Sequence, residues 1–221
     1  MKIFLLVLLL IACAEVALLK AEEGGEPAVR VNGVVITQMR VERYFAEYLE
    51  DQGRALGSIR SPSLYQRLRG EALEQLIDKE LLWQEARRRG ITVEDAAIDA
   101  RLGELRQAFP NREAFLRALA TAGFDEASYA DYTRHEIASQ QVFVQLGRAD
   151  PPSDEEVLAF HEERLQAGKN EANQLAARQV EREQGLALSK NLLFERHQAQ
   201  ARQTALQRLR GEAVIERADT R

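Results

Sequence analysis

The sequence predicts a mainly α-helical fold, in which a long C-terminal helix returns to the start of the chain and a small two- or three-stranded ribbon joins the two ends. Apolar residues recur at helical spacing through most of the 221 residues. The 5 prolines and 13 glycines are few and lie mostly between the periodic segments. Strand-like runs are confined to residues 28–36 and 213–216.

The longest uninterrupted pattern begins at Ser61-Pro62 and ends before Gly90. A serine can cap a helix N-terminus, and a proline is compatible with the first turn. Arginines crowd the last turn, where the helix dipole favours cations. The apolar stripe contains Leu73, Leu76, Ile77 and Leu81, widened by Leu82 and Trp83. Because the stripe is wide, we expect this helix to pack against neighbours on more than one side.

The strand-like runs predict a hairpin and a closing strand. Ala28–Val31 and Val34–Ile36 flank Asn32-Gly33, a pair typical of a tight turn. An isolated two-stranded ribbon is only marginally stable. We therefore expect the run Ala213–Glu216 to pair with the hairpin and to bring the chain ends together.

The remaining helices are delimited by caps and breakers. Thr37 is expected to cap the first helix, and Thr92 or Val93 to open the one that Pro110 closes. Further helices are predicted from Asn111 to Gly123, from Asp125 to Gly147, from the capping box Ser153–Glu156, and through a last apolar face of Leu188, Leu192, Ala199, Leu206 and Leu209 that ends at Gly211. Residues 168–182 are polar with weak periodicity.

Three segments follow from this organisation. Residues 1–21 are a signal sequence, 22–150 a helical domain, and 151–221 the capping-box helix, a linker and the returning helix with its closing strand. The break Asp150-Pro151-Pro152 sets the boundary between the last two.

The N-terminus has a positive start and a short apolar run that Glu15 interrupts, which is typical of an export signal. Two processing sites compete. Leu10-Ile-Ala-Cys13 resembles a bacterial lipobox, which would make Cys13 a lipidation site; alternatively, cleavage follows Ala14 or Ala21. An uncleaved anchor is the third possibility. Each alternative places the chain in the periplasm or elsewhere outside the cytoplasm, either tethered to a membrane through Cys13 or free.

Composition and motifs point away from several function classes. The net charge of −5 does not indicate nucleic-acid binding. The single cysteine excludes an internal disulfide and a cysteine-based zinc site. His135, His161 and His197 lie far apart without a second ligand at metal-binding spacing, which favours surface or capping roles. No serine nucleophile elbow, dinucleotide fingerprint or phosphate-binding loop is present, so we expect no catalytic residue, metal or cofactor.

Aromatic and apolar side chains at helical spacing are the candidates for binding other polypeptides. They are Val41, Tyr44, Phe45, Tyr48, Tyr129 and Tyr132. Such residues usually form core. The functional alternative is a partly exposed apolar groove for extended peptides.

The order of motifs resembles the SurA N-terminal domain and PrsA-like export chaperones. The motifs are Val31-Asn-Gly-Val-Val-Ile-Thr37, Leu76-Ile-Asp-Lys-Glu-Leu-Leu-Trp-Gln-Glu-Ala86, Gly90-Ile-Thr-Val93 with Asp99, Phe115–Gly123, Tyr129, Pro152-Ser-Asp-Glu-Glu-Val157 with Phe160, and Ala205–Glu216. The resemblance extends over nearly all of the chain after the signal. It implies a helical chaperone domain whose returning helix and closing strand complete the fold.

One departure from the family bears on function. Most relatives carry a parvulin prolyl-isomerase domain after the Ser-Asp-Glu-Glu-Val helix, whereas only about residues 171–182 occupy that place here. The resemblance therefore implies an ATP-independent chaperone, or holdase, for unfolded envelope or secreted proteins. The alternatives are prolyl isomerisation, by family inheritance, and a dedicated partner or scaffold of one secreted protein.

Overall fold

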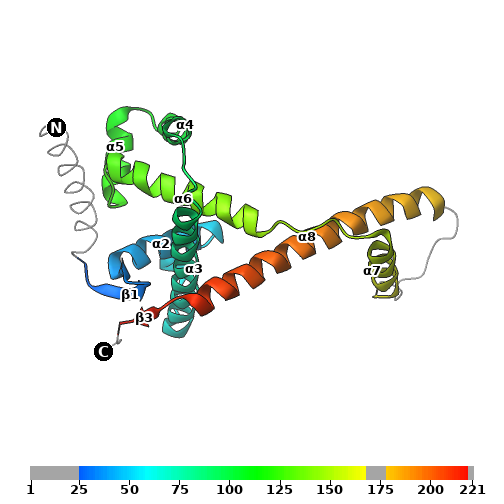
Figure 1. Cartoon of the computed structure of the whole chain (residues 1–221). Helices are drawn as coiled ribbons and strands as arrows, with labels where there is room; N and C mark the ends of the chain where they lie inside the picture. The colour runs from blue at the N-terminus through cyan, green and yellow to red at the C-terminus, as the bar shows by residue number, and fades with distance from the viewer. Residues whose placement is uncertain (1–24, 168–177, 219–221) are drawn as a thin grey trace, which may run out of the picture. The chain divides into compact units, whose positions relative to one another are not determined.

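The computed structural model describes residues 25–167 and 178–218, so the predicted signal and Cys13 lie outside the described residues. This part of the chain contains seven α-helices and one three-stranded sheet, which confirms the predicted fold class (Figure 1). The elements are β1 (Pro27–Val31), β2 (Val34–Thr37), α2 (Gln38–Asp51), the 3-10 turn η1 (Leu56–Ser58), α3 (Pro62–Arg88), α4 (Asp95–Gln107), α5 (Arg112–Thr121), α6 (Glu126–Leu146), α7 (Asp154–Ala167), α8 (Arg178–Glu212) and β3 (Ile215–Arg217).

The described residues form two compact units. The first unit contains residues 25–139 and 209–218, and the second unit contains residues 140–208. The domain boundary expected at Asp150-Pro151-Pro152 stays a prediction. None of the described helices is both long and apolar enough to cross a membrane.

The sheet has the order β2-β1-β3, with both pairs antiparallel. Asn32 and Gly33 adopt positive φ values of 51° and 84°, as a two-residue hairpin turn requires. The Asn32 side chain donates to Gln84 Oε1 on α3 (2.8 Å) and accepts from the backbone N–H of Val214 (2.8 Å). This single amide therefore ties the hairpin both to α3 and to the segment that enters β3, and the predicted closing strand is confirmed (Figure 1).

Helix α3 is the centre of the first unit. Ser61 Oγ caps its N-terminus by accepting from Leu64 N, and Pro62 is its first residue, as predicted. At the other end, Gly90 has φ 66°, and the N–H groups of Gly90 and Ile91 donate to the carbonyls of Arg87 and Ala86. This is the Schellman arrangement, which satisfies carbonyls that the helix end leaves free. The buried residues of α3 are Leu68, Ala72, Leu76, Ile77, Glu80, Leu81, Leu82, Glu85 and Ala86.

Two clusters of buried apolar residues lie among the described helices of the first unit, besides the buried residues of the sheet and of α3. One joins α2 to α3 through Phe45, Leu49, Leu68 and Ala72. The other joins α4, α5 and α6 around Ile98, Leu102, Phe115 and Leu119. The caps at Thr37 and Asn111 are confirmed, since each side chain accepts from the N–H three residues later. The expected start of α4 was wrong: the helix begins at Asp95 after Glu94, whose side chain makes no capping hydrogen bond.

In the second unit, α7 packs on α8. The predicted capping box is confirmed, because Ser153 N donates to Glu156 Oε2 (2.7 Å) and Glu156 N donates to Ser153 Oγ (3.3 Å). Val157 on α7 is buried, as are Ser189 and Leu193 on α8. The apolar face expected on α8 was partly wrong, since Leu188 and Ala199 are exposed. Helix α8 already begins at Arg178, within the polar stretch 168–182.

Candidate functional site: an aromatic surface and an acidic helix face

Helices α2 and α6 place the six candidate binding residues at two depths. Val41 and Phe45 are 0% and 1% exposed, so their side chains form core and do not reach the surface. Tyr44 and Tyr48, on the same helix, are partly buried and pack against that core. Tyr129 and Tyr132 on α6 are also partly buried. The four tyrosines are therefore the candidates that a bound polypeptide can touch.

Tyr129 and Tyr132 belong to a cluster of three rings whose third member is Phe124. The ring centroids lie 5.2 Å (Phe124–Tyr129), 5.3 Å (Phe124–Tyr132) and 5.9 Å (Tyr129–Tyr132) apart. The guanidinium of Arg43, on α2, lies 4.0 Å from the Phe124 ring centroid. Such a cation–π contact holds the edge of α2 against the ring cluster.

Phe124 was missed in the sequence, although a signal for it was present. Gly123 has φ 81°, and Phe124 N donates to Leu119 O (2.9 Å), which closes α5 with a Schellman arrangement. The residue after the glycine in this arrangement is commonly apolar and packs back on the helix. Gly123-Phe124 could therefore have been recognised as a helix end that positions an aromatic ring.

A polar network lies between the two pairs of tyrosines. Tyr132 donates its hydroxyl to Glu47 Oε2 (3.0 Å), and Tyr44 donates to Gln75 Oε1 (3.0 Å). Lys79 pairs with Glu136, and its ammonium lies 5.1 Å from the Tyr44 ring centroid. The structure thus places Tyr44 and Tyr132, which are far apart in the sequence, under the influence of the same two carboxylates, Glu47 and Glu136.

Burial raises the pKa of three groups in this network, Tyr44, Tyr132 and Glu47. Burial, reinforced by Glu136 and Glu47, raises the pKa of Tyr44 to about 12 and also raises that of Tyr132. Burial likewise raises the pKa of Glu47, against the hydrogen bond from Tyr132. Both tyrosines therefore keep their protons at neutral pH, so they act as hydrogen-bond donors and apolar surfaces and not as bases or nucleophiles.

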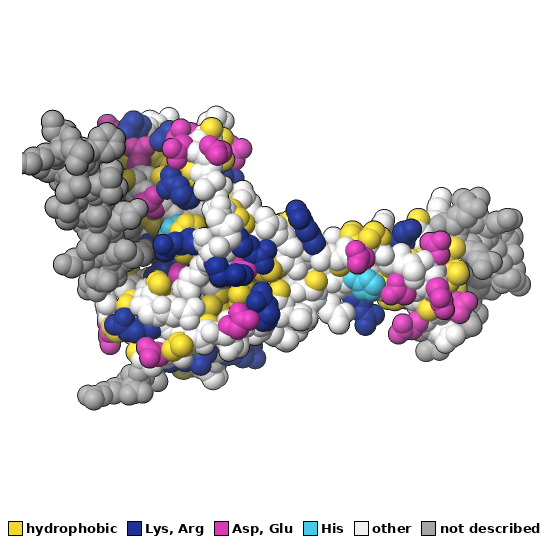
Figure 2. Space-filling model, in the orientation of Figure 1, with side chains coloured by type: hydrophobic (Ala, Val, Ile, Leu, Met, Phe, Trp, Pro, Cys, Tyr) yellow, Lys and Arg dark blue, Asp and Glu magenta, His cyan; other side chains and the backbone are white. Residues whose placement is uncertain are grey.

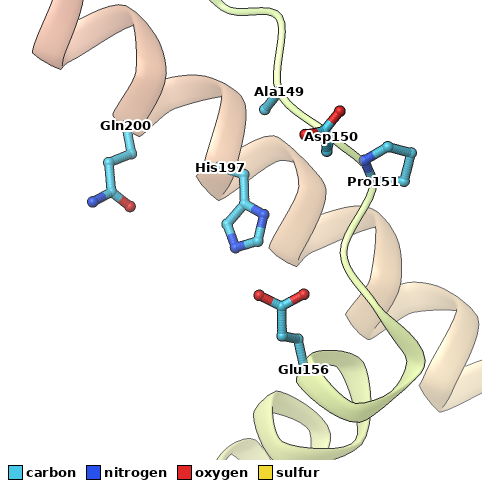
Figure 3. Close-up of a pocket in the computed structure, with 6 residues that line it drawn as sticks. All are labelled: Ala149, Asp150, Pro151, Glu156, His197 and Gln200. Carbon is cyan, nitrogen blue, oxygen red and sulfur yellow. The ribbon is translucent and has the colours of Figure 1, made fainter.

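The second unit has a cavity of about 260 Å³ (Figure 3). Its lining residues are Ala149, Asp150, Pro151, Glu156, His197 and Gln200. The His197 ring on α8 and the Glu156 carboxylate on α7 point toward one another. Glu156 accepts from the N–H and the hydroxyl of Ser153 (2.7 and 2.9 Å), and these bonds lower its pKa. The capping box thus fixes this carboxylate as an anion at the start of α7.

The three histidines have different surroundings and do not form a common site in the described residues. His135 stacks on Trp83, with ring centroids 3.9 Å apart, so it packs against α3 and is not the simple surface residue that was expected. His161 Nδ1 lies 3.0 Å from the hydroxyl oxygen of Ser189, which is fully buried. Within residues 25–167 and 178–218, no group of three or more His, Cys, Asp or Glu side chains could hold a metal ion.

Large apolar side chains are exposed in both units. In the second unit they are Val144, Leu158, Leu165 and Leu188, with exposed fractions from 44% to 58%. Figure 2 shows hydrophobic side chains interspersed with acidic ones on the part of the molecule that carries α7. Leu165 is exposed although it follows the buried Val157 at helical spacing on α7.

Comparison with known proteins identifies one family. The family model described as "SurA-like N-terminal domain" matches residues 1–143, and no parvulin domain is matched. No curated protein matched the chain.

Proposed function

This chain belongs to the family of SurA-like N-terminal domains, and from that premise we propose that it is an ATP-independent holdase for unfolded exported polypeptides. The family match over residues 1–143 is the observation that carries the proposal, because the family is chaperone-like. A holdase needs no reaction centre. It needs accessible apolar surface that binds weakly enough to release the client without fuel.

The partly buried tyrosines support this proposal. Tyr44, Tyr48, Tyr129 and Tyr132 each combine an apolar ring with a hydroxyl, so they can cover apolar client side chains while remaining compatible with water. Val41 and Phe45 are assigned a supporting role, since both are buried and Phe45 belongs to the core against which Tyr44 and Tyr48 pack. We propose that a client lies across α2 and the first half of α6.

The place of action is part of the same proposal. SurA-like proteins are typically extracytoplasmic. We propose that residues 1–21 direct export, with either lipidation at Cys13 or cleavage after Ala14 or Ala21. Mass spectrometry of the mature N-terminus distinguishes a lipid-modified cysteine from an unmodified new terminus.

Aggregation of an unfolded outer-membrane protein, diluted from urea, tests the proposal by light scattering. We expect the purified chain to suppress scattering at near-stoichiometric ratios without nucleotide. The variant Tyr48→Ala/Tyr129→Ala should suppress it less, because two rings of the proposed surface are removed. Leu116→Ala, at an exposed apolar position on α5 that is not part of the proposed surface, serves as the control.

Two results would contradict the holdase. One is unchanged scattering with a chain that is folded by circular dichroism. The other is acceleration of proline isomerisation in a protease-coupled peptide assay, which would favour the enzymatic alternative. Capture of a single client from an envelope extract, in place of many unfolded chains, would favour a dedicated partner.

A further inference from the structure

One face of α7 combines exposed leucines with glutamates. Glu155, Leu158, Glu162 and Leu165 recur at three- and four-residue intervals, so they form one stripe along the helix, here called the outer stripe. Leu158 and Leu165 are 44% and 54% exposed, and both glutamates are exposed. The buried Val157 lies on another face of the helix.

The charge around the outer stripe is strongly negative. From Asp150 to Gln166 the sequence has six carboxylates and one basic residue, Arg164. Asp154 has Lys190 at 3.8 Å. Among the residues that the structure describes, neither Glu155 nor Glu162 forms an ion pair.

Helix stability accounts for only some of these carboxylates. Asp154, Glu155 and Glu156 lie in the first turn of α7, where the helix dipole favours negative charge. Glu162 and Glu163 lie beyond the first turn, where the dipole no longer favours negative charge, and no cation lies four residues from either. Their charge is therefore unexplained by the helix itself and is available to a partner.

We propose that the outer stripe binds unfolded client segments in which apolar side chains and lysine or arginine take turns at every second position, so that both kinds lie on the same face of the extended segment. This inference rests on the proposed holdase function and adds a client preference to it. The leucines offer apolar contacts, and the glutamates beside them attract the flanking cations. From Glu155 to Leu165 the helix rises about 15 Å. An extended segment of about five residues covers that length.

Two matched fluorescent peptides test this preference by anisotropy with the purified full chain. Both carry leucine and a charged residue in turn at every second position, with serine between them; the charged residue is lysine in one peptide and glutamate in the other. We expect the lysine peptide to bind more tightly at low ionic strength, and the difference to shrink in 0.5 M salt, roughly the range where exposed charges are screened within a few ångström. Glu155→Gln/Glu162→Gln should weaken the lysine peptide about three- to tenfold and leave the glutamate peptide unchanged or slightly improved.

Leu158→Ser/Leu165→Ser should weaken the lysine peptide at both ionic strengths, because the apolar anchors are lost. The matched controls are Met39→Ser/Leu56→Ser, at two exposed apolar positions of the first unit, and Glu50→Gln/Glu195→Gln, at two exposed glutamates outside α7. All variants lie at exposed positions, and circular dichroism checks that each remains folded.

Equal affinity for the two peptides at low salt would overturn the inference, as would affinities that the stripe variants leave unchanged. Self-association that Leu158→Ser/Leu165→Ser abolishes would also overturn it, because the stripe would then be a contact between copies of this chain. The aggregation assay separates this failure from that of the holdase: suppression without charge preference removes only the outer-stripe proposal.

Discussion

At the scale of single residues, the folded chain depends on side chains whose partners are far from obvious in the sequence. Asn32 links the hairpin to α3 and to the entry of β3 through one amide. Glu85 is buried on α3, with a side chain only 2% exposed, yet it carries a charge. Arg88 and Arg89 bind it at 2.6 to 2.7 Å. A buried carboxylate is tolerated because these two guanidiniums compensate its charge.

The pKa of Glu85 leads to a prediction about acid stability. The hydrogen bonds from Arg88, opposed by burial and reinforced by Arg89, lower this pKa from 4.5 to about 2. A carboxylate with a lowered pKa stabilises the fold above its unfolded pKa, and this contribution is lost as the pH falls from about 4.5 through 2. We expect Glu85→Gln to lower the free energy of unfolding at pH 7 by roughly 1–3 kcal/mol.

Urea unfolding followed by the fluorescence of Trp83, the only tryptophan, measures this effect in the first unit. Below pH 3 the variant and the parent chain should approach each other in stability. Glu104→Gln is the control: its pair with Arg101 is 68% exposed on both sides, and such pairs contribute little. An equal loss at pH 7 and at pH 2.5 would contradict the assignment of the effect to charge.

At the scale of elements, glycines at helix ends and at close contacts between helices decide where each helix can lie. Gly90 and Gly123 end α3 and α5 with positive φ, and each end directs the chain into the next element. Gly185 acts differently, because it permits close packing within the second unit. A Cβ added there would lie 2.9 Å from His161 Cε1, on the ring that pairs with Ser189.

Two glycine-to-alanine substitutions should therefore have opposite effects. Gly70, on α3, has no atom within 4 Å of an added Cβ, so Gly70→Ala should raise the free energy of unfolding by about 0.5–1 kcal/mol through helix propensity. Gly185→Ala gains the same propensity but displaces His161, and overpacking costs roughly 1–3 kcal/mol. We expect a net loss, measured by thermal unfolding in circular dichroism; stabilisation by both substitutions would show that α7 can move away from α8 freely.

At the scale of the whole molecule, the two ends of the described chain complete the first unit together. β3 pairs with β1, and Arg210 reaches α3, where it donates to Asp78 (2.5 Å) and to Glu74 (2.7 Å). Arg217 on β3 also pairs with Glu74 (2.6 Å). Residues 209–218 are thus part of the structure that holds the proposed client surface.

Ending the chain after Ala213 should destabilise the first unit, because β3 and its hydrogen bonds to β1 are lost. We expect the free energy of unfolding to fall by about 2–4 kcal/mol, counting about 1 kcal/mol for each hydrogen bond lost. Trp83 fluorescence in urea measures it. A chain ended after Ala218 keeps β3 and should unfold like the full chain; similar losses in both would show that β3 contributes little.

The sequence by itself determined the helical class, the hairpin at Asn32-Gly33, the caps at Ser61, Thr37 and Asn111, and the return of the last strand. These features are local or follow from one unsatisfied strand, so their signals lie in neighbouring residues. It also supported the family, through motif order. It did not determine which of the candidate binding residues a client can reach. Val41 and Tyr44 belong to one helical pattern, and only the packing of α2 in the folded chain buries Val41 and leaves Tyr44 partly exposed.

The tertiary structure alone decided which distant residues meet. The Phe124 ring packs with those of Tyr129 and Tyr132, and the Arg43 guanidinium lies over it. Glu47 accepts a hydrogen bond from the hydroxyl of Tyr132, which is 85 residues away in the sequence. The tertiary structure also leaves Leu165 exposed, although Val157 at helical spacing on the same helix is buried. The physical reason is common to these cases: burial is set by which faces of neighbouring helices come together, and periodicity along one helix does not contain that information.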